Sequence, residues 1–202
     1  MRALLVSSMV AVSAFAQPVE MPTLTEKEIQ KLTAGEMVLH DRKPTDNRGV
    51  AAESMAVIDA PSDEVWPVIR DCGLYDQFMP RVKKTELRDE NGKPICHTEL
   101  KMPWPIPDLW SDNSFVLREE PAGHFTREWS MVRGAYKRNN GAWKLLPWGD
   151  DKKKTLAMYI IDSDPGLAIP DGLLKSAQTG SLPDVFKAVR KRVVALRDVK
   201  KP

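Results

Sequence analysis

Acidic and basic side chains that could do acid-base chemistry gather between residues 99 and 133. The acids are Glu99, Asp112 and Glu128, and the bases are Arg118 and Arg133. A carboxyl group held in an apolar cleft can polarise the polar end of a ligand or act as a general base. Because side chains alternate between the two faces of a strand, about half of these charges would point to solvent instead. We predict no catalytic residue among them.

The sequence contains none of the common motifs of nucleophilic, nucleotide-dependent or metal catalysis. There is no G-x-S-x-G, no glycine-rich phosphate loop, no H-E-x-x-H and no C-x-x-C. His40, His97 and His124 lie far apart, so the fold alone would have to assemble a metal site. We predict no metal and no other cofactor. Cys96 and His97 are neighbours, and in a strand they would point to opposite faces rather than act as a pair.

The first 16 residues are typical of a secretory signal peptide. After Arg2 the chain carries no charge until Glu20, and Ala14-Phe15-Ala16 is a small-x-small cleavage pattern. The apolar stretch is about 14 residues long, shorter than the roughly 20 of a membrane-spanning helix, which argues against a single-pass anchor. We predict cleavage near residue 16 and a periplasmic or secreted mature protein. Export would permit a disulfide between Cys72 and Cys96, with two buried thiols as the alternative.

The remaining chain has the pattern of one α+β domain with a leader. The leader, residues 17–44, contains a short helix that begins with the T-x-x-E capping box of Thr25 and Glu28. The domain, residues 45–199, opens with a strand at 50–59 and two short helices. Between residues 81 and 161, alternating or apolar stretches are separated by turn signals, which predicts an antiparallel meander of five or six strands. These signals are Asn91-Gly92, Pro121-Ala122-Gly123, Asn139-Asn140-Gly141 and Gly149-Asp150-Asp151.

The last segment predicts one long amphipathic helix packed across that sheet. Val185, Val189, Val193 and Leu196 recur at helical spacing, with Lys and Arg between them. The basic residues either form a solvated face or attract anionic lipid head groups at a membrane surface. They are not interleaved with stacking aromatics, and the formal net charge is only +2, so we expect no nucleic-acid partner.

Several stretches resemble a known superfamily. Residues 57–87 read VIDAPSDEVWPVIRDCGLYDQFMPRVKKTEL and are similar to the opening of START-like (SRPBCC) proteins, which include polyketide cyclases and coenzyme-Q-binding proteins. Three later stretches resemble START lipid-binding domains: MPWPIPDLWSDNSFVL, GAWKLLPWGDDKKKTLAMYIIDSDPGLAIPDGLL and LPDVFKAVRKRV. The resemblance implies a helix-grip fold, in which a curved antiparallel sheet wraps around the C-terminal helix. It also implies an apolar cavity between the two that binds or carries a lipid-like ligand.

On this resemblance we expect the cavity to be lined by aromatic and apolar side chains and two charged ones. A filled core would need the same apolar residues, so composition does not separate the two cases. In START domains an Arg-Asp pair commonly follows the Pro-Trp-Pro segment, whereas this chain keeps the acid and lacks the adjacent base; Arg118 or Arg133 could replace it. The expected lining residues are Phe78, Trp104, Trp110, Asp112, Trp129, Met131, Arg133, Met158, Ile160, Leu173, Leu174 and Phe186.

Residues 101–112, KMPWPIPDLWSD, combine two tryptophans with three prolines. Proline is excluded from sheet interiors, so we predict a connection between two strands at the rim of the cavity. Trp104 and Trp110 would either fold back onto the core or form an aromatic lid that closes the cavity or enters a membrane interface.

Together these features predict an exported protein that binds or transfers a hydrophobic small molecule such as a lipid and is not primarily an enzyme. One alternative is a cyclase- or dehydratase-type enzyme on the same fold, with a buried acid or Arg in the cleft. Another is an interaction domain with a filled cavity, which a pocket below about 300 Å³ would fit.

Overall fold

The computed structural model describes residues 19–102, 104, 107–167 and 180–199. They contain one curved antiparallel sheet in which the early strand β2 pairs with the last strand, β8. The strands follow the order β1-β2-β8-β7-β6-β5-β4-β3 across the sheet. Their bounds are β1 Val38–Arg42, β2 Val50–Ile58, β3 Val82–Glu90, β4 Lys93–Leu100, β5 Leu109–Glu120, β6 His124–Gly134, β7 Arg138–Trp148 and β8 Lys154–Asp164.

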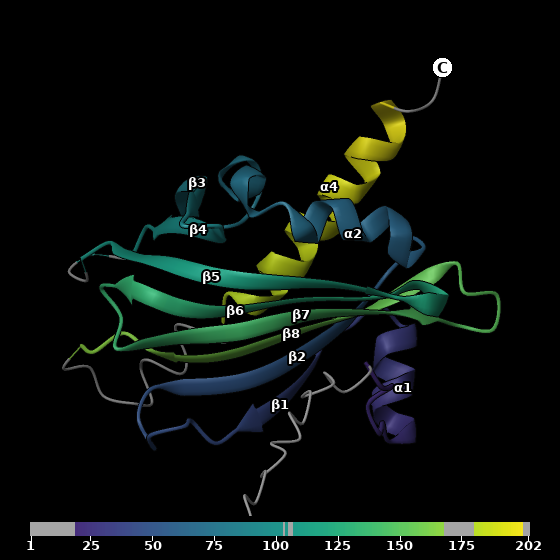
Figure 1. Cartoon of the computed structure of the whole chain (residues 1–202). Coiled ribbons are helices and arrows are strands. Elements are labelled where there is room, and N and C mark those ends of the chain that lie inside the picture. Colours follow the sequence, from purple (N-terminus) through teal and green to yellow (C-terminus); the bar gives the residue numbers. More distant parts are fainter. Residues whose placement is uncertain (1–18, 103, 105–106, 168–179, 200–202) are drawn as a thin grey trace, which may run out of the picture.

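Helices cover both faces of this sheet (Figure 1). The helices α2 (Ser62–Arg70) and α4 (Leu182–Val199) lie on one face, and α1 (Glu26–Thr33) lies against the other. We call these the helix face and the outer face. The short 3-10 helix η1 (Cys72–Gln77) follows α2, and η2 (Pro121–Gly123) joins β5 to β6. The predicted α+β helix-grip fold is confirmed. None of the helices in the described ranges is long and apolar enough to cross a bilayer.

The C-terminal helix buries the apolar stripe that its spacing predicts. Val189 and Val193 are buried, and Val185 and Leu196 pack against the same core. Phe186 meets the indole of Trp143 edge to face, with ring centroids 5.7 Å apart. Burying each of these side chains stabilises the fold by roughly 1.5 to 3 kcal/mol, so the stripe holds α4 on the sheet.

Basic side chains of α4 anchor the helix as well. The guanidinium of Arg190 donates to the carbonyls of Val57 and Gly35, and Arg192 donates to Gln77 Oε1 at 3.1 Å. Arg197 pairs with Glu64 of α2. The basic pattern of this helix therefore has a structural use in at least three positions.

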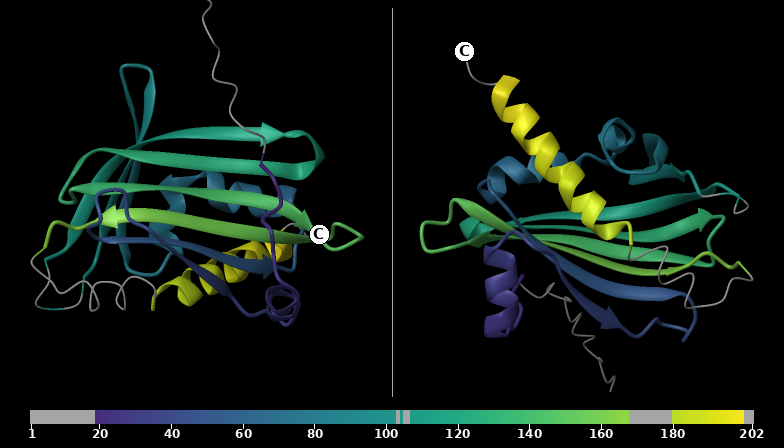
Figure 2. Two further views of the ribbon diagram at one scale, coloured as in Figure 1. Left: turned by 90° about the horizontal axis from the view of Figure 1, so that it is seen from below. Right: turned by 180° about the vertical axis from the view of Figure 1, so that it is seen from behind.

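The leader packs against the outer face and belongs to the fold (Figure 2). Leu32 of α1 and Val19 join a second core with Met55, Leu156 and other side chains of the sheet's outer face. The capping box of Thr25 and Glu28 is present, as predicted. The sheet also begins earlier than residue 45, because β1 lies within the segment assigned to the leader.

A disulfide joins Cys72 of η1 to Cys96 of β4, with the two Cα atoms 6.4 Å apart. It closes a loop between positions 24 residues apart and ties η1 to β4. Both cysteines are buried.

Removing this disulfide should destabilise the protein without changing its fold. A Cys72→Ser, Cys96→Ser double variant is expected to lose about 3 kcal/mol of unfolding free energy, because a bridge of this loop length restricts the unfolded chain. Urea denaturation measures the loss, and the reduced wild-type protein serves as the matched control. Two free thiols in the purified exported protein, or equal midpoints with and without reductant, would contradict the bridge.

Candidate functional site

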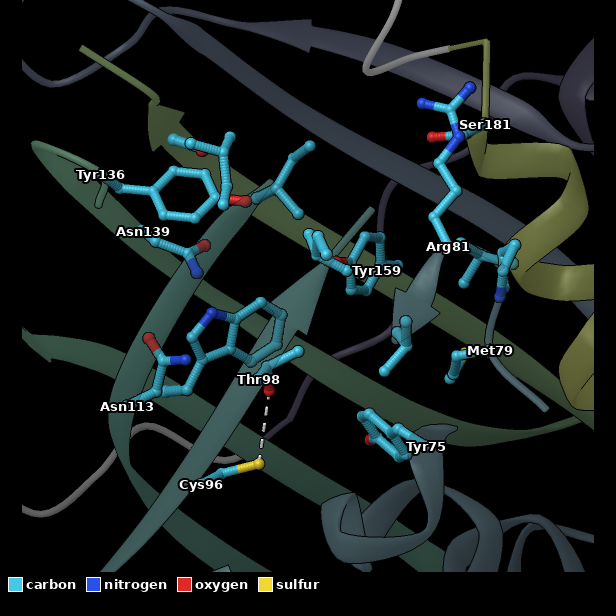
Figure 3. Close-up of a pocket in the computed structure, with 18 of the residues that line it drawn as sticks. Tyr75, Met79, Arg81, Cys96, Thr98, Asn113, Tyr136, Asn139, Tyr159 and Ser181 are labelled. Carbon is cyan, nitrogen blue, oxygen red and sulfur yellow. Dashed lines mark hydrogen bonds between the residues drawn. The ribbon is translucent and has the colours of Figure 1, made fainter. Parts of the chain in front are cut away.

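A cavity of about 240 Å³ lies between the helix face of the sheet, η1 and the first turn of α4 (Figure 3). Strands β4 to β8 form its floor, and Leu182 and Val185 of α4 close one side. Most of its walls are apolar or aromatic. Lining residues include Tyr75, Met79, Val82, Leu100, Leu109, Trp129, Trp143, Tyr159 and Ile161.

Strand alternation decides which residues of β8 reach the cavity. Tyr159 and Ile161 line it, whereas Met158 belongs to the core on the outer face and Ile160 follows the same parity. The expectation that Met158 and Ile160 line the cavity is therefore wrong. In the sequence, Met158 and Ile160 look as suitable for a cavity wall as Tyr159 and Ile161 do. The reason is that both faces of β8 are buried, so both carry apolar residues.

Trp129 of β6 does line the cavity, and its place depends on Gly141 of β7. The two residues pair across the strands, and a Cβ at position 141 would lie 2.3 Å from the Trp129 indole. A side chain there would displace the ring. The predicted turn at Asn139-Asn140-Gly141 is wrong for the same reason, because this glycine makes room inside a strand instead of bending the chain.

An irregularity between β5 and β6 separates Met131 from Arg133. Asn113 pairs with Met131 but its neighbour Asp112 pairs with Arg133, so Val132 is an extra residue in β6. Such a bulge turns the following side chain to the other face. Arg133 consequently points to the outer face, and Met131 is half-buried beside the cavity without lining it.

Asp112 also lies on the outer face, in a polar cluster with its own partners. It is 2% exposed, and its carboxylate lies 2.6 Å from His97 Nδ1 and 2.7 Å from the Arg133 guanidinium. Arg133 donates twice more to Glu90, which raises the pKa of Arg133. Arg133 thus supplies the base missing beside Asp112, whereas Arg118 pairs with Glu128. The expectation that Asp112 and Arg133 face the cavity is wrong.

The other expected lining residues lie elsewhere. Phe78 packs against the core beside Tyr75, and Phe186 is buried against Trp143. Trp110 is the second residue of β5 and lies on the outer face next to His97, so the loop between β4 and β5 is shorter than predicted. Trp104 is in that loop and is 92% exposed, so it does not fold back onto the core. Leu173 and Leu174, like residues 1–16, lie outside the described residues.

Polar groups in the cavity are mostly neutral. Burial raises the pKa of Tyr136 to about 12 and also raises the pKa of Tyr75 and Tyr159. Asn113 and Asn139 each donate to the hydroxyl of Ser111, and Asn113 Oδ1 is buried without a partner in the described part of the chain. These groups can hydrogen-bond a ligand, but the tyrosines are poor proton donors near neutral pH.

One charged residue that lines the cavity was not predicted from the sequence. Arg127 of β6 is 4% exposed and lines the cavity two residues before Trp129. Its guanidinium carbon lies 4.8 Å from the ring centroid of Phe115 and 5.6 Å from that of Tyr75. Arg127 and Trp129 are two residues apart in one strand, so alternation places both side chains on the helix face. This spacing is the feature of the sequence from which Arg127 could have been predicted.

No carboxylate and no histidine is found among the lining residues that the structure describes. Nor do the described residues bring three potential metal ligands together. An arginine stays protonated in proteins and does not serve as a general base. The described lining residues therefore offer hydrogen bonds and one buried positive charge to a ligand.

The model of the family described as "polyketide cyclase / dehydrase and lipid transport" matches residues 58–190. This chain belongs to that family. The match runs from the end of β2 into α4 and includes the strands that form the cavity floor. The family description joins proteins that handle hydrophobic molecules by chemistry and by transport. A search of curated proteins finds no match.

Solved structures support the same fold. A STAR-related lipid transfer protein from Xanthomonas axonopodis superposes with a TM-score of 0.63 at 22% identity, covering 78% of this chain and 93% of that one. Human StAR-related lipid transfer protein 5 superposes with a TM-score of 0.69 at 13% identity, covering 81% of this chain and 84% of that one. The Zhui aromatase/cyclase from Streptomyces superposes with a TM-score of 0.52 at 15% identity, covering 82% of this chain and 98% of that one. At these identities the likeness establishes the helix-grip fold alone.

Truncating Asp112 should weaken the fold and leave the cavity intact. Asp112→Ala removes the carboxylate that lies against His97 and Arg133, and we expect a loss of about 2 kcal/mol in unfolding free energy, since the buried His97 ring loses a hydrogen-bond partner while Arg133 keeps Glu90. Glu128→Ala is the control, because its pair with Arg118 is half-exposed and worth about 1 kcal/mol at most. Thermal or urea unfolding measures both. Equal losses in the two variants would contradict the buried role of Asp112.

Proposed function

We propose that this protein is an exported binding or transfer protein for a small hydrophobic ligand held in the cavity beneath α4. The observation that carries the proposal is a mostly apolar cavity in a family of lipid transport and polyketide-modifying proteins, without a lining carboxylate or histidine in the described residues. Burial of apolar ligand surface would supply most of the affinity, and the few polar groups would set its orientation.

The size of the cavity limits the ligand. Its volume of about 240 Å³ lies below the roughly 300 to 1,000 Å³ typical of drug-sized ligands, which is the size expected for the alternative of an interaction domain with a filled cavity. That alternative fits the volume, whereas the buried Arg127 and the unpartnered Asn113 Oδ1 among the described lining residues favour a ligand. We therefore propose a single short acyl chain or a compact ring system rather than a two-chain lipid.

Export to the periplasm or the cell exterior is part of the proposal. The signal-peptide pattern of residues 1–16 motivates it, and the disulfide between Cys72 and Cys96 fits it, because disulfides persist in oxidising compartments. Fractionation of cells and mass measurement of the mature N-terminus would test it. Cytoplasmic protein that keeps residues 1–16 would contradict it.

The enzymatic alternative has less support. It calls for a buried acid or Arg in the cleft; the buried acid, Asp112, lies on the opposite face of the sheet, whereas Arg127 meets the second condition. What the cavity offers is Arg127, which cannot act as a base, and tyrosines whose pKa is raised. These groups favour binding over proton transfer.

Filling the cavity should abolish binding. Val185 lines it from α4, and Val185→Phe is expected to lower the affinity for 1-octanol at least about tenfold, since a ligand would be forced to overlap the new ring. Val194→Phe, on the exposed side of the same helix, is the matched control and should bind as the wild type does. Calorimetric titration measures both.

Native mass spectrometry and lipid extraction of protein purified from its own host complete this test. We expect an apolar molecule to accompany the wild type and the Val194→Phe variant but not Val185→Phe. Protein that carries no extractable ligand and does not bind 1-octanol would sink the binding proposal.

We further propose that the loop between β4 and β5 makes transient contact with a membrane surface. Trp104 is almost fully exposed, and its loop starts at Lys101, whose amide donates to the carbonyl of Arg81 at the cavity rim. An exposed tryptophan beside basic residues is the composition that membrane interfaces favour.

Trp104→Ala should slow ligand transfer between vesicles without weakening binding in solution. We expect the transfer rate to fall about fivefold or more, because burial of one large side chain in the interface is lost. Trp110→Ala, which truncates a tryptophan packed against His97 on the outer face, is the control. Unchanged transfer by the Trp104 variant would rule out the membrane contact.

A further inference from the structure

Within the part of the chain that the structure describes, Arg127 is a buried cation without a counter-ion. Among the described residues no carboxylate pairs with it, no acceptor takes a hydrogen bond from it, and its Nε is fully buried without a partner. Its guanidinium instead lies near three aromatic rings, those of Tyr75, Phe115 and Trp129. The other arginine that lines the cavity, Arg81, is exposed.

This arrangement costs free energy unless something compensates the charge. A guanidinium carries five N–H donors, and burying it away from water is unfavourable when these donors remain unpaired. The faces of aromatic rings attract the cation but accept no more than weak hydrogen bonds. The in-plane donors of Arg127 therefore still require an acceptor, and the cavity that Arg127 lines is where one can be placed.

A carboxylate fits this requirement better than other anions. Its two oxygens match the fork of a guanidinium in a bidentate pair, and its single negative charge balances the single positive charge of Arg127. A phosphate monoester would bring more negative charge than one buried arginine neutralises, and a phosphodiester head group would add a bulky second substituent to a cavity of about 240 Å³. The apolar walls formed by Leu100, Leu109 and Ile161 would surround the uncharged remainder of the ligand.

We propose that the cavity selects carboxylate amphiphiles, such as short- to medium-chain fatty acids, and that Arg127 binds the carboxylate. The proposal rests on the proposed function, because it requires that the cavity binds an apolar ligand. It identifies the chemical class of that ligand and makes Arg127 the residue that sets specificity.

Three eight-carbon probes with different head groups test the proposal on the wild-type protein: octanoate, 1-octanol and octyltrimethylammonium. At neutral pH we expect octanoate to bind at least about tenfold more tightly than 1-octanol, since a hydrogen-bonded charge pair adds to the same apolar burial. The cationic probe should bind most weakly. If none of the three binds, the proposed function fails; if 1-octanol binds as well as octanoate, only the carboxylate inference fails.

Substitutions at Arg127 assign the selectivity to this side chain. Arg127→Met keeps an unbranched, flexible side chain, though a shorter one, and removes the charge; it should lower octanoate affinity about tenfold or more while changing 1-octanol affinity less than about threefold. Arg127→Lys keeps the positive charge but lacks the paired N–H donors of a guanidinium. Its affinity for octanoate should lie between that of the wild type and that of Arg127→Met. Arg118→Met, at an arginine that pairs with Glu128 and is not among the lining residues, is the control and should leave the preference for octanoate in place.

Thermal unfolding separates ligand binding from a structural role. Without ligand, Arg127→Met should unfold no earlier than the wild type, because an unpaired buried charge has been removed. Octanoate should raise the wild-type midpoint more than 1-octanol does and lose that advantage in the variant. A variant that unfolds earlier yet keeps its preference for octanoate would overturn the proposal. If the variant does not fold, the comparison of probes on the wild type still decides it.

Discussion

The packing of α4 across the helix face of the sheet is the contact on which the rest of the structure depends. Phe186, Val189 and Val193 are buried in the core that also contains Trp143 and Ala157. Only the first turn of the helix, at Leu182 and Val185, borders the cavity. The far side of the cavity is formed by residues of η1 and the segment after it, and the disulfide ties η1 to β4.

The two faces of the sheet also differ in how their charged side chains are paired. On the outer face, Asp112, His97 and Arg133 satisfy one another, as buried charges in proteins generally do. On the helix face, Arg127 meets aromatic rings and no carboxylate among the described residues. The first cluster is complete in the protein itself and stabilises the fold, whereas the second would be completed by the anionic ligand that we propose.

The family and the solved structures place these features on a scaffold used for both transport and chemistry. What distinguishes the two uses is the set of groups that line the cavity. Here the lining is apolar and aromatic with neutral tyrosines and one buried cation, a combination suited to holding an amphiphile. The modest cavity volume favours a single short chain, and the exposed Trp104 gives the rim a side chain with affinity for membrane interfaces.

The sequence by itself determined the fold class, the meander and the face that α4 buries, because these depend on local periodicity and capping. Val189 and Val193 lie in the core as their spacing predicts. Only the tertiary structure decided which strand residues face the cavity. Alternation along a strand shows which residues share a face, but not which face lines the cavity. In β8 both faces are buried, so composition does not distinguish them. Gly141 lies inside a strand where it makes room for Trp129, and the extra residue Val132 turns Arg133 to the outer face. These outcomes depend on partner strands distant in sequence, which is why Asp112 was expected in the cavity and Arg127 was not.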